Sequence, residues 1–207
     1  MIRAEGLHKN YGPLRAVDGI SFSVQPGEVL GFLGPNGAGK TTTMRMLAGF
    51  VPASAGYAEI CGFRVDLQPL EAKRRLGYLP EGAPAYGEMA PGEFLQFTGQ
   101  LRGLHGAALR KRIDEVSGRL QLGPVLRQPI ETLSKGFRRR VGLAQAILHD
   151  PPVLILDEPT DGLDPNQKHE VRELINAMAA EKIIVISTHI LEEVDAVCTR
   201  AIIIAGG

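Results

Sequence analysis

Cysteine is scarce in this sequence, and net charge is absent. Cys61 and Cys198 are the two cysteines among 207 residues, and neither lies in a Cys-x-x-Cys or Cys/His cluster. We therefore expect both to be small, reduced core residues. The 23 basic and 23 acidic side chains cancel, which argues against an overall electrostatic attraction to nucleic acid or anionic lipid and leaves room only for a local patch.

Long hydrophobic runs, repeats and low-complexity segments are also missing. No apolar run approaches the ~20 residues that a membrane-spanning helix needs, and residues 1–5 carry charges where a signal peptide would need an apolar region. A chain of 207 residues with 44% hydrophobic side chains can still bury one substantial core. We expect a soluble, intracellular, globular α/β protein.

The sequence does contain a glycine-rich loop between an apolar run and a helical pattern. Residues 28–33 read as a buried strand, and the helical pattern continues to Leu47. This is the context of a P-loop, whose backbone N–H groups surround phosphates, with Lys40 on the β- and γ-phosphates and the Thr41 hydroxyl on Mg²⁺. The alternative is a glycine-rich turn without a ligand. The residues expected to bind the nucleotide here are Gly34, Pro35, Asn36, Gly37, Ala38, Gly39, Lys40, Thr41 and Thr42.

A second apolar run, residues 153–156, ends in two acids. In parallel sheets, ligands bind beyond the carboxyl ends of the strands. We expect Asp157 to hold Mg²⁺ through water, and Glu158 to orient and deprotonate the attacking water. The alternative is a pair of acids that only caps a helix at a strand end.

Alternating strand and helix patterns predict the architecture. Runs of β-branched residues that alternate with helices favour a parallel sheet covered on both faces. Strand signals vanish over about residues 83–148, which we expect to form a helical subdomain inserted into a core of residues 1–82 and 149–207. Expected strands include residues 20–24, 57–62, 77–81, 152–158, 183–187 and 201–205, and expected helices include residues 70–76, 109–120, 169–180 and 191–197. Gly206 and Gly207 read as a hairpin turn without a second strand, which suggests a shortened chain.

A polar and basic stretch runs from Thr132 to Arg140 into a helix. Ser134 and Gly136 would stand at the helix N-terminus, where a hydroxyl, free N–H groups and the helix dipole form an anion site. The residues alone leave this open beside an ordinary N-cap. We interpret the run that starts at Arg138 as a solvated helix face rather than a nucleic-acid patch.

Taken in order, these motifs resemble the ATP-binding subunit of an ABC transporter over nearly the whole chain. The P-loop is followed by residues 133–137, the pair Asp157-Glu158, residues 161–164 and Ser187-Thr188-His189. The resemblance implies one ABC ATPase domain: a P-loop NTPase with a RecA-like, mostly parallel sheet, an N-terminal antiparallel β subdomain and an inserted α-helical subdomain. It also implies ATP and Mg²⁺ as ligands and ATP hydrolysis coupled to transport.

The resemblance further implies a homodimer that holds two ATP molecules between head-to-tail copies. Ser134 and Gly136 would contact the γ-phosphate bound to the other copy, and Asp164 would cross the interface and couple the two sites. His189 would hydrogen-bond the γ-phosphate and Glu158. The expected catalytic residues are Lys40, Glu158 and His189.

One aromatic residue and three departures from the family pattern bear on the site. Tyr11 matches the aromatic that stacks on adenine, although by itself it would be an ordinary turn tyrosine. Glu81 stands where the family usually carries Gln; it can still coordinate Mg²⁺ but adds negative charge near the phosphates. Lys135 and Phe137 replace Gly and Gln of the family's signature sequence. Lys135 adds a positive charge that could favour ATP, and Phe137 removes a polar contact.

The leading interpretation is an ATPase that drives export through a separate transmembrane permease, at the cytoplasmic face of the membrane. The Leu79-Pro80-Glu81 loop and the basic signature helix resemble the ABC-2 exporter branch, which includes gliding-motility-type systems. One alternative is a soluble ABC ATPase acting on nucleic acid or ribosomes, which the single cassette and zero net charge disfavour. Another is a nucleotide-binding regulator with weak hydrolysis, against which Glu158 and His189 speak.

Overall fold

The computed structural model describes residues 1–205, so the turn expected at Gly206 and Gly207 lies outside the described residues. The strands are β1 (Ile2–Tyr11), β2 (Leu14–Val24), β3 (Val29–Leu33), β4 (Ala55–Ile60), β5 (Phe63–Arg64), β6 (Leu76–Leu79), β7 (Val153–Asp157), β8 (Ile183–Thr188) and β9 (Arg200–Ile203). The helices are α1 (Lys40–Leu47), α2 (Pro69–Arg74), α3 (Pro91–Leu101), α4 (Gly106–Arg119), α5 (Lys135–Ile147), α6 (Pro165–Ala179) and α7 (Leu191–Val197). Short 3₁₀ turns cover Gly123–Val125 and Ile130–Thr132.

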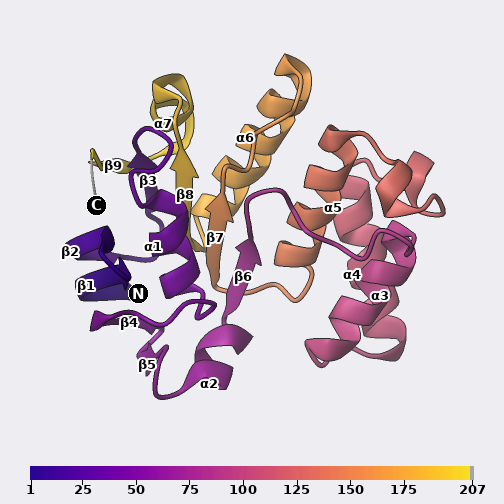
Figure 1. Ribbon diagram of the computed structural model, residues 1–207. Coiled ribbons are helices and arrows are strands. Elements are labelled where there is room, and N and C mark those ends of the chain that lie inside the picture. The colour runs from indigo at the N-terminus through magenta and orange to yellow at the C-terminus, as the bar shows by residue number, and fades with distance from the viewer. Residues whose placement is uncertain (206–207) are drawn as a thin grey trace.

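The larger sheet is parallel and sends its loops out at one edge. Over the described residues its strands lie in the order β6-β7-β8-β3-β9, and each neighbouring pair is parallel. The loops after β3, β6, β7 and β8 therefore leave from the same carboxyl edge, where ligands bind in such sheets (Figure 1). Every residue of β7 and β8 is buried, which confirms the predicted sheet covered on both faces.

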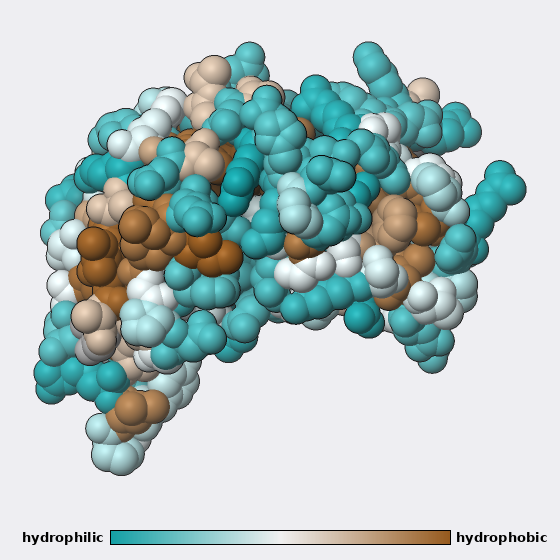
Figure 2. Space-filling view, turned by 90° about the horizontal axis from the view of Figure 1, so that it is seen from above, coloured by the Kyte–Doolittle hydropathy of each residue, from teal (hydrophilic) through white to brown (hydrophobic). Residues whose placement is uncertain are grey.

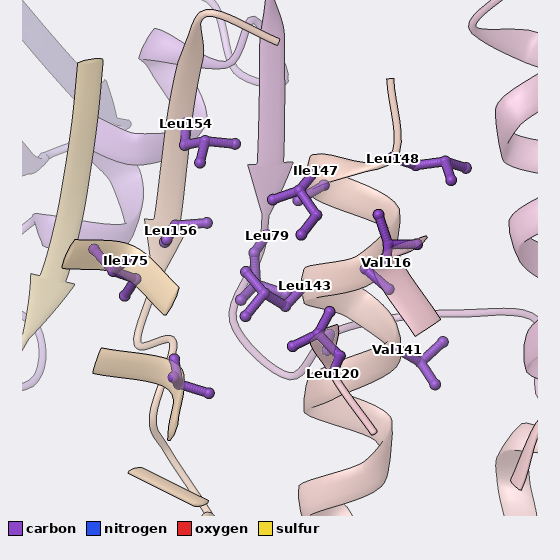
Figure 3. Packing of buried hydrophobic residues seen from close by; sticks show 14 of the residues in the cluster. Leu79, Val116, Leu120, Val141, Leu143, Ile147, Leu148, Leu154, Leu156 and Ile175 are labelled. Atoms are coloured by element: carbon purple, nitrogen blue, oxygen red, sulfur yellow. The ribbon is translucent and has the colours of Figure 1, made fainter. Parts of the chain in front are cut away.

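Alternate side chains of β7 enter two different cores. Val153 and Ile155 pack with α1 and the N-terminal strands. Leu154 and Leu156 belong to the other core, and Figure 3 shows them on the side of α5, because successive strand residues point to opposite faces. The parallel sheet thus has α1 and the N-terminal strands on one face and α5 on the other.

A smaller antiparallel sheet, in the order β2-β1-β4-β5, lies beside α1 (Figure 1). Its first hairpin pairs Ile2 with Val24 and Tyr11 with Leu14, which confirms the antiparallel strand predicted at residues 20–24. The turn of this hairpin holds Tyr11 at the end of β1, across from the loop that precedes α1.

The helices α3, α4 and α5 stand together on the far side of β6 (Figure 1). A Cβ atom at Gly142 of α5 would lie 2.8 Å from side-chain atoms of both Leu79 and Ala83, so glycine allows this helix to approach β6 closely. Figure 3 shows Leu79 directed toward Leu143 of α5. The helical block and the sheet therefore share one continuous core.

The basic run in α5 is not the solvated face that the sequence suggested. Arg138 is exposed, but Arg139 and Arg140 are only 3% and 6% exposed. Arg139 donates to the carbonyl of Pro80 at 3.1 Å, and Arg140 donates to the carbonyl of Leu120 at 3.4 Å. Long guanidinium side chains can reach carbonyl groups beneath the surface while their stems pack, so the run ties α5 to its neighbours instead of facing water.

Several element boundaries differ from the sequence prediction, and two of the differences have a clear physical reason. Helix α6 begins at Pro165 rather than at residue 169, because Asp164 accepts a hydrogen bond from the N–H of Gln167 at 2.9 Å and proline suits the first helical position. Helix α2 ends at Arg74, so Leu76 pairs with Val153 in the sheet instead of closing the helix.

The face shown in Figure 2 is largely hydrophilic, with hydrophobic residues gathered at the left, on the side where Figure 1 places β9, and in a second group at the right, on the side of α3, α4 and α5. Cys61 and Cys198 are free, half-buried thiols, each packed against one of the two cores, in line with the expectation of reduced core residues. Within residues 1–205, no helix combines the length and the apolar character needed to cross a bilayer.

Candidate nucleotide site

The loop between β3 and α1 depends on its glycines. A Cβ at Gly34 would lie 2.2 Å from the carbonyl oxygen of Ile204, and one at Gly39 would lie 2.4 Å from that of Ala16. Gly39 also has a φ of +96° and is the N-cap of α1, where in the described structure no side chain caps the helix. The first N–H groups of α1 therefore remain available for an anion.

Lys40 crosses this loop. Its side chain is buried, and Nζ donates to the carbonyls of Gly34 at 2.7 Å and Pro35 at 3.1 Å. The same ammonium lies 3.8 Å from Oε1 of Glu158. A positive charge is thus held inside the loop, which is the arrangement that P-loops use for phosphates.

A cleft of about 290 Å³ opens over the loop. Tyr11 lies at its wall, 46% exposed, with Nζ of Lys9 5.0 Å from the ring centroid. The cleft is lined by Tyr11, Leu14, Ala16, Asn36, Gly37, Gly39, Lys40, Thr41, Thr42, Glu81 and Glu158. Four separate stretches of the sequence that were predicted for one site therefore meet here.

Three oxygen-bearing side chains converge at the start of α1. Oγ1 of Thr41 lies 3.3 Å from Oδ1 of Asp157 and 3.4 Å from Oε2 of Glu81. Asp157 is fully buried and accepts a short hydrogen bond from Ser187, whereas its Oδ2 has no hydrogen-bond partner among residues 1–205. Burial raises the pKa of Asp157, and the hydrogen bonds from Ser187 and Thr41 act in the opposite direction.

This oxygen set suits Mg²⁺. Magnesium in nucleotide sites binds one or two protein oxygens and completes its octahedron with water and phosphate. The unpartnered Oδ2 of Asp157 is a buried atom that such a cation, or a water bound to it, would satisfy. Across the described part of the chain, no cluster of three or more His, Cys, Asp and Glu side chains could hold a metal. The oxygens of Thr41, Asp157 and Glu81 match the small protein ligand set of a cation that arrives with phosphates.

Glu158 and His189 form a pair beside Lys40. Nδ1 of His189 and Oε2 of Glu158 are 3.1 Å apart. Glu158 has a φ of +52°, and its N–H donates to the carbonyl and the hydroxyl of Ser187 at 3.2 and 3.0 Å. Burial raises the pKa of Glu158, and His189 and Lys40 offset part of that effect. A carboxylate with a raised pKa is a stronger base, able to take a proton from water.

Ser134, Gly136 and Asp164 stand apart from this cleft. Ser134 is exposed and accepts a hydrogen bond from the N–H of Phe137 at 3.3 Å, so it is an N-cap of α5. Asp164 caps α6 in the same way. Within the described chain, none of the three lines the cleft over the P-loop. If they bind a nucleotide, it is not the one in the cleft of their own chain.

Comparison with known proteins decides the family. Residues 17–161 match the family described as ABC transporter. The chain belongs to this family. It is an ABC ATPase cassette, 39% identical over its whole length to the Nod factor export ATP-binding protein I of Ralstonia nicotianae, and 40% identical over 94% of its length to the ABC transporter ATP-binding protein NatA of Bacillus subtilis. It spans 65% of the first relative, about two thirds, and 80% of the second.

Solved structures agree with the fold of the cassette. An ATP-binding subunit of an ABC transporter is 30% identical and superposes with a TM-score of 0.90, over 98% of this chain and 85% of that one. A dimeric bacterial ABC transporter cassette is 22% identical, with a TM-score of 0.92 over 99% and 94% of the two chains, and shares the fold. The predicted P-loop NTPase architecture is confirmed.

The departures from the family pattern have definite places in this cassette. Glu81 lies against Thr41, as expected for the residue that replaces Gln. Lys135 forms an ion pair at 2.9 Å with Asp161 of the same chain, and the ring of Phe137 lies 5.3 Å from the guanidinium of Arg140. Lys135 therefore does not approach the cleft of its own chain.

The sequence reasoning missed three buried charges of the cassette, Arg139, Arg140 and Glu193. Arg139 lies 4.0 Å from Asp161 in addition to its bond with Pro80. Glu193 is 3% exposed in α7. A signal for Glu193 was present, because Val194 and Val197 mark the inner face of α7 and helical spacing places residue 193 on that face.

Proposed function

We propose that this ABC cassette binds and hydrolyses Mg-ATP and thereby drives export through a separate membrane permease. The observation that carries the proposal is the meeting of Lys40, Thr41 and Glu158 at one cleft. The buried Asp157 lies directly behind them, 3.3 Å from the Thr41 hydroxyl. A phosphate cradle, oxygen ligands for a cation and a base for water are the parts that phosphoryl transfer to water needs.

The nucleotide would lie along the cleft with its phosphates in the loop. The N–H groups of residues 34–42 would donate to the phosphate oxygens, and Lys40 would exchange its hydrogen bonds with Gly34 and Pro35 for bonds to the β- and γ-phosphates. Tyr11, which presents an exposed ring at the wall of the cleft, would stack on the adenine.

The cation would be held by Thr41, Asp157 and Glu81. When bound, Mg²⁺ would neutralise negative charge on the phosphate oxygens. Asp157 would contribute through the oxygen that has no partner among residues 1–205. Glu81 supplies a carboxylate oxygen where the family usually carries the side-chain amide of Gln. Its negative charge would attract the cation more strongly and would repel the phosphates.

Glu158 would act as the base in hydrolysis. It would take a proton from a water molecule whose oxygen forms a bond to the γ-phosphorus, while the bond to the bridging oxygen breaks and ADP departs. His189 would hold the Glu158 carboxylate through the 3.1 Å hydrogen bond and donate to the γ-phosphate. Lys40 would stabilise the charge that develops on the phosphate oxygens.

Two copies of the chain would complete each site. Ser134 and Gly136 stand at the N-terminus of α5, outside their own cleft, and a head-to-tail partner would bring such helix ends to the γ-phosphate. Asp164 would lie at the same interface. Lys135 would have to leave Asp161 to reach that phosphate, which costs little because both partners are exposed.

The membrane partner and the direction of transport are inferred from relatives. The similar proteins include ATP-binding proteins named for Nod factor export and for linearmycin resistance, which favours the ABC-2 exporter branch. The cassette would bind its permease at the cytoplasmic face. We propose that residues 1–82 and 149–207 hold the nucleotide and that residues 83–148 transmit the motion of closure.

Phosphate release from ATP tests the proposal. The parent protein should hydrolyse ATP with Mg²⁺ and stop in excess EDTA, and Glu158→Gln should lower kcat by about 100-fold or more, because a positioned base contributes on that order. Glu173→Gln, which changes an exposed glutamate of α6, is the matched control and should retain the parent rate. A Glu158→Gln protein as active as the parent would show that another group is the base.

A further inference from the structure

We infer that Glu193 of α7 is a positioning residue that fixes the loops carrying Glu158 and His189 relative to each other. It contacts neither of those two side chains in the structure; it acts through the threonines that flank them. The inference rests on the proposed function, because it concerns the geometry of the proposed base and its histidine.

The carboxylate of Glu193 joins two loops. Oε2 accepts a hydrogen bond from the hydroxyl of Thr188 at 2.6 Å, and Oε1 accepts one from the hydroxyl of Thr160 at 2.5 Å. Thr188 directly precedes His189 at the end of β8, and Thr160 follows Glu158 by two residues after β7. All three groups of this bridge are at most 4% exposed. Neither hydroxyl can exchange its partner for water without opening the core.

Two cations of α6 lie beside this carboxylate. Nζ of Lys168 lies 3.3 Å and Nη2 of Arg172 lies 4.0 Å from Oε1 of Glu193. Burial by itself raises the pKa of Glu193, but the hydrogen bonds from Thr160, Thr188 and Lys168 outweigh burial and hold the pKa below its ordinary value. Hydrogen bonds to an ionised acceptor are about twice as strong as neutral ones, so the bridge is a stiff one.

The loops need such a bridge. Glu158 has the left-handed φ of +52°, a strained conformation for a residue other than glycine that persists only where its surroundings hold it in place. The N–H of Ile190 donates to the Thr188 hydroxyl at 3.1 Å, so the turn that presents His189 is ordered by the same hydroxyl that binds Glu193. Removing the carboxylate would release both loops, the one that carries His189 and the one that carries Glu158, and so loosen the 3.1 Å contact between these two side chains.

A purely structural role is the competing explanation, because any buried glutamate with these partners stabilises the fold. The two explanations differ in what they predict for the reaction. A structural residue lowers stability, and its effect on kcat is independent of His189. A positioning residue lowers kcat at unchanged ATP affinity, and its effect vanishes once His189 is absent.

The test compares Glu193→Gln with Glu192→Gln, its exposed neighbour on the same helix, which loses the same charge. Misplacement of catalytic groups costs about 10- to 100-fold, so Glu193→Gln should lower kcat by that factor with the ATP Kd within about twofold of the parent. In a His189→Ala background the same substitution should lower kcat by less than about twofold. Thr160→Val, which removes one hydroxyl at constant shape, should reproduce the kcat effect if Glu193→Gln folds poorly.

Hydrogen exchange of the amides gives a readout that does not need catalysis. Residues 158–164 and 188–190 should exchange faster in Glu193→Gln, or in Thr160→Val, than in Glu192→Gln. Equal exchange in these segments would overturn the inference, and so would an equal loss of kcat with and without His189. A parent protein without ATPase activity would refute the proposed function instead, and exchange would still decide the role of Glu193.

Discussion

The hydroxyl of Thr41 lies 3.3 Å from a carboxylate oxygen of Asp157, although the two residues are 116 positions apart in the chain. Sheet topology explains the contact. Thr41 follows β3 and Asp157 ends β7, and both strands run parallel to β8, which lies between them. The loop after β3 and the end of β7 therefore reach the same edge, where the pair can share a cation with phosphates.

Asp157→Asn should separate stability from function. Because burial raises the pKa of Asp157 in the folded protein, the ionised form costs stability above the unfolded pKa, and this cost fades as pH falls. At pH 7 without Mg²⁺ we expect the free energy of unfolding to rise by about 1 kcal/mol, measured by urea denaturation, while Mg²⁺-dependent ATPase activity falls at least tenfold. Asp114→Asn, an exposed change on α4, is the control. A less stable Asp157→Asn protein would contradict this account of the buried carboxylate.

Lys40→Ala should act on nucleotide binding itself. Hydrogen bonds to charged groups contribute about 1.5–3 kcal/mol, so removal of the ammonium should weaken ATP binding by about 10- to 100-fold in calorimetry. Lys111→Ala removes an exposed lysine of α4 and should leave the affinity unchanged. An unchanged Kd for Lys40→Ala would mean that phosphates bind elsewhere.

The pH dependence of kcat/KM should report the pair of Glu158 and His189. Glu158 must be ionised to accept a proton, so the rate should fall as the pH drops through its pKa, which burial raises above its ordinary value. His189 lowers that pKa, and His189→Gln should therefore move the acid limb of the residual activity to higher pH. His169→Gln, an exposed substitution on α6, should leave the limb in place. A shift to lower pH in His189→Gln would contradict the assigned contact.

The contact between α5 and β6 should be sensitive to a single methyl group. Gly142→Ala would place Cβ 2.8 Å from side-chain atoms of Leu79 and Ala83, and such overpacking costs about 1–3 kcal/mol in unfolding free energy. Gly118→Ala in α4 meets no atom within 4 Å and should be neutral or stabilise by up to about 1 kcal/mol. Equal effects in urea denaturation would contradict the close approach of α5 to the sheet.

Much of the fold and the candidate site could be predicted because the signals are local. The P-loop between β3 and α1, the acids at the end of β7 and the antiparallel pairing of β2 each follow from a short pattern of residue types. Burial of long charged side chains could not be predicted in this way. Arg139 and Arg140 look solvated in a run of three arginines, and only the packing of α5 against Pro80 and Leu120 gives them carbonyl partners.

The roles assigned to Ser134 and Gly136 differ from the other predictions in kind. They were assigned from the family resemblance, and the single chain accounts for Ser134 as an N-cap of α5. Their proposed ligand belongs to a second copy, which one chain cannot bring to them. The sandwich of two copies is therefore the central claim that still depends on measurement.

The mass of Glu158→Gln in size-exclusion chromatography with light scattering, with and without Mg-ATP, tests that claim most directly. This variant keeps the phosphate loop and lacks the base, so bound ATP should persist between the two copies. The account predicts a monomer without nucleotide and a dimer with Mg-ATP, and a loss of the dimer on adding Ser134→Ala. A protein that binds ATP and remains monomeric at every concentration of Mg-ATP would contradict it.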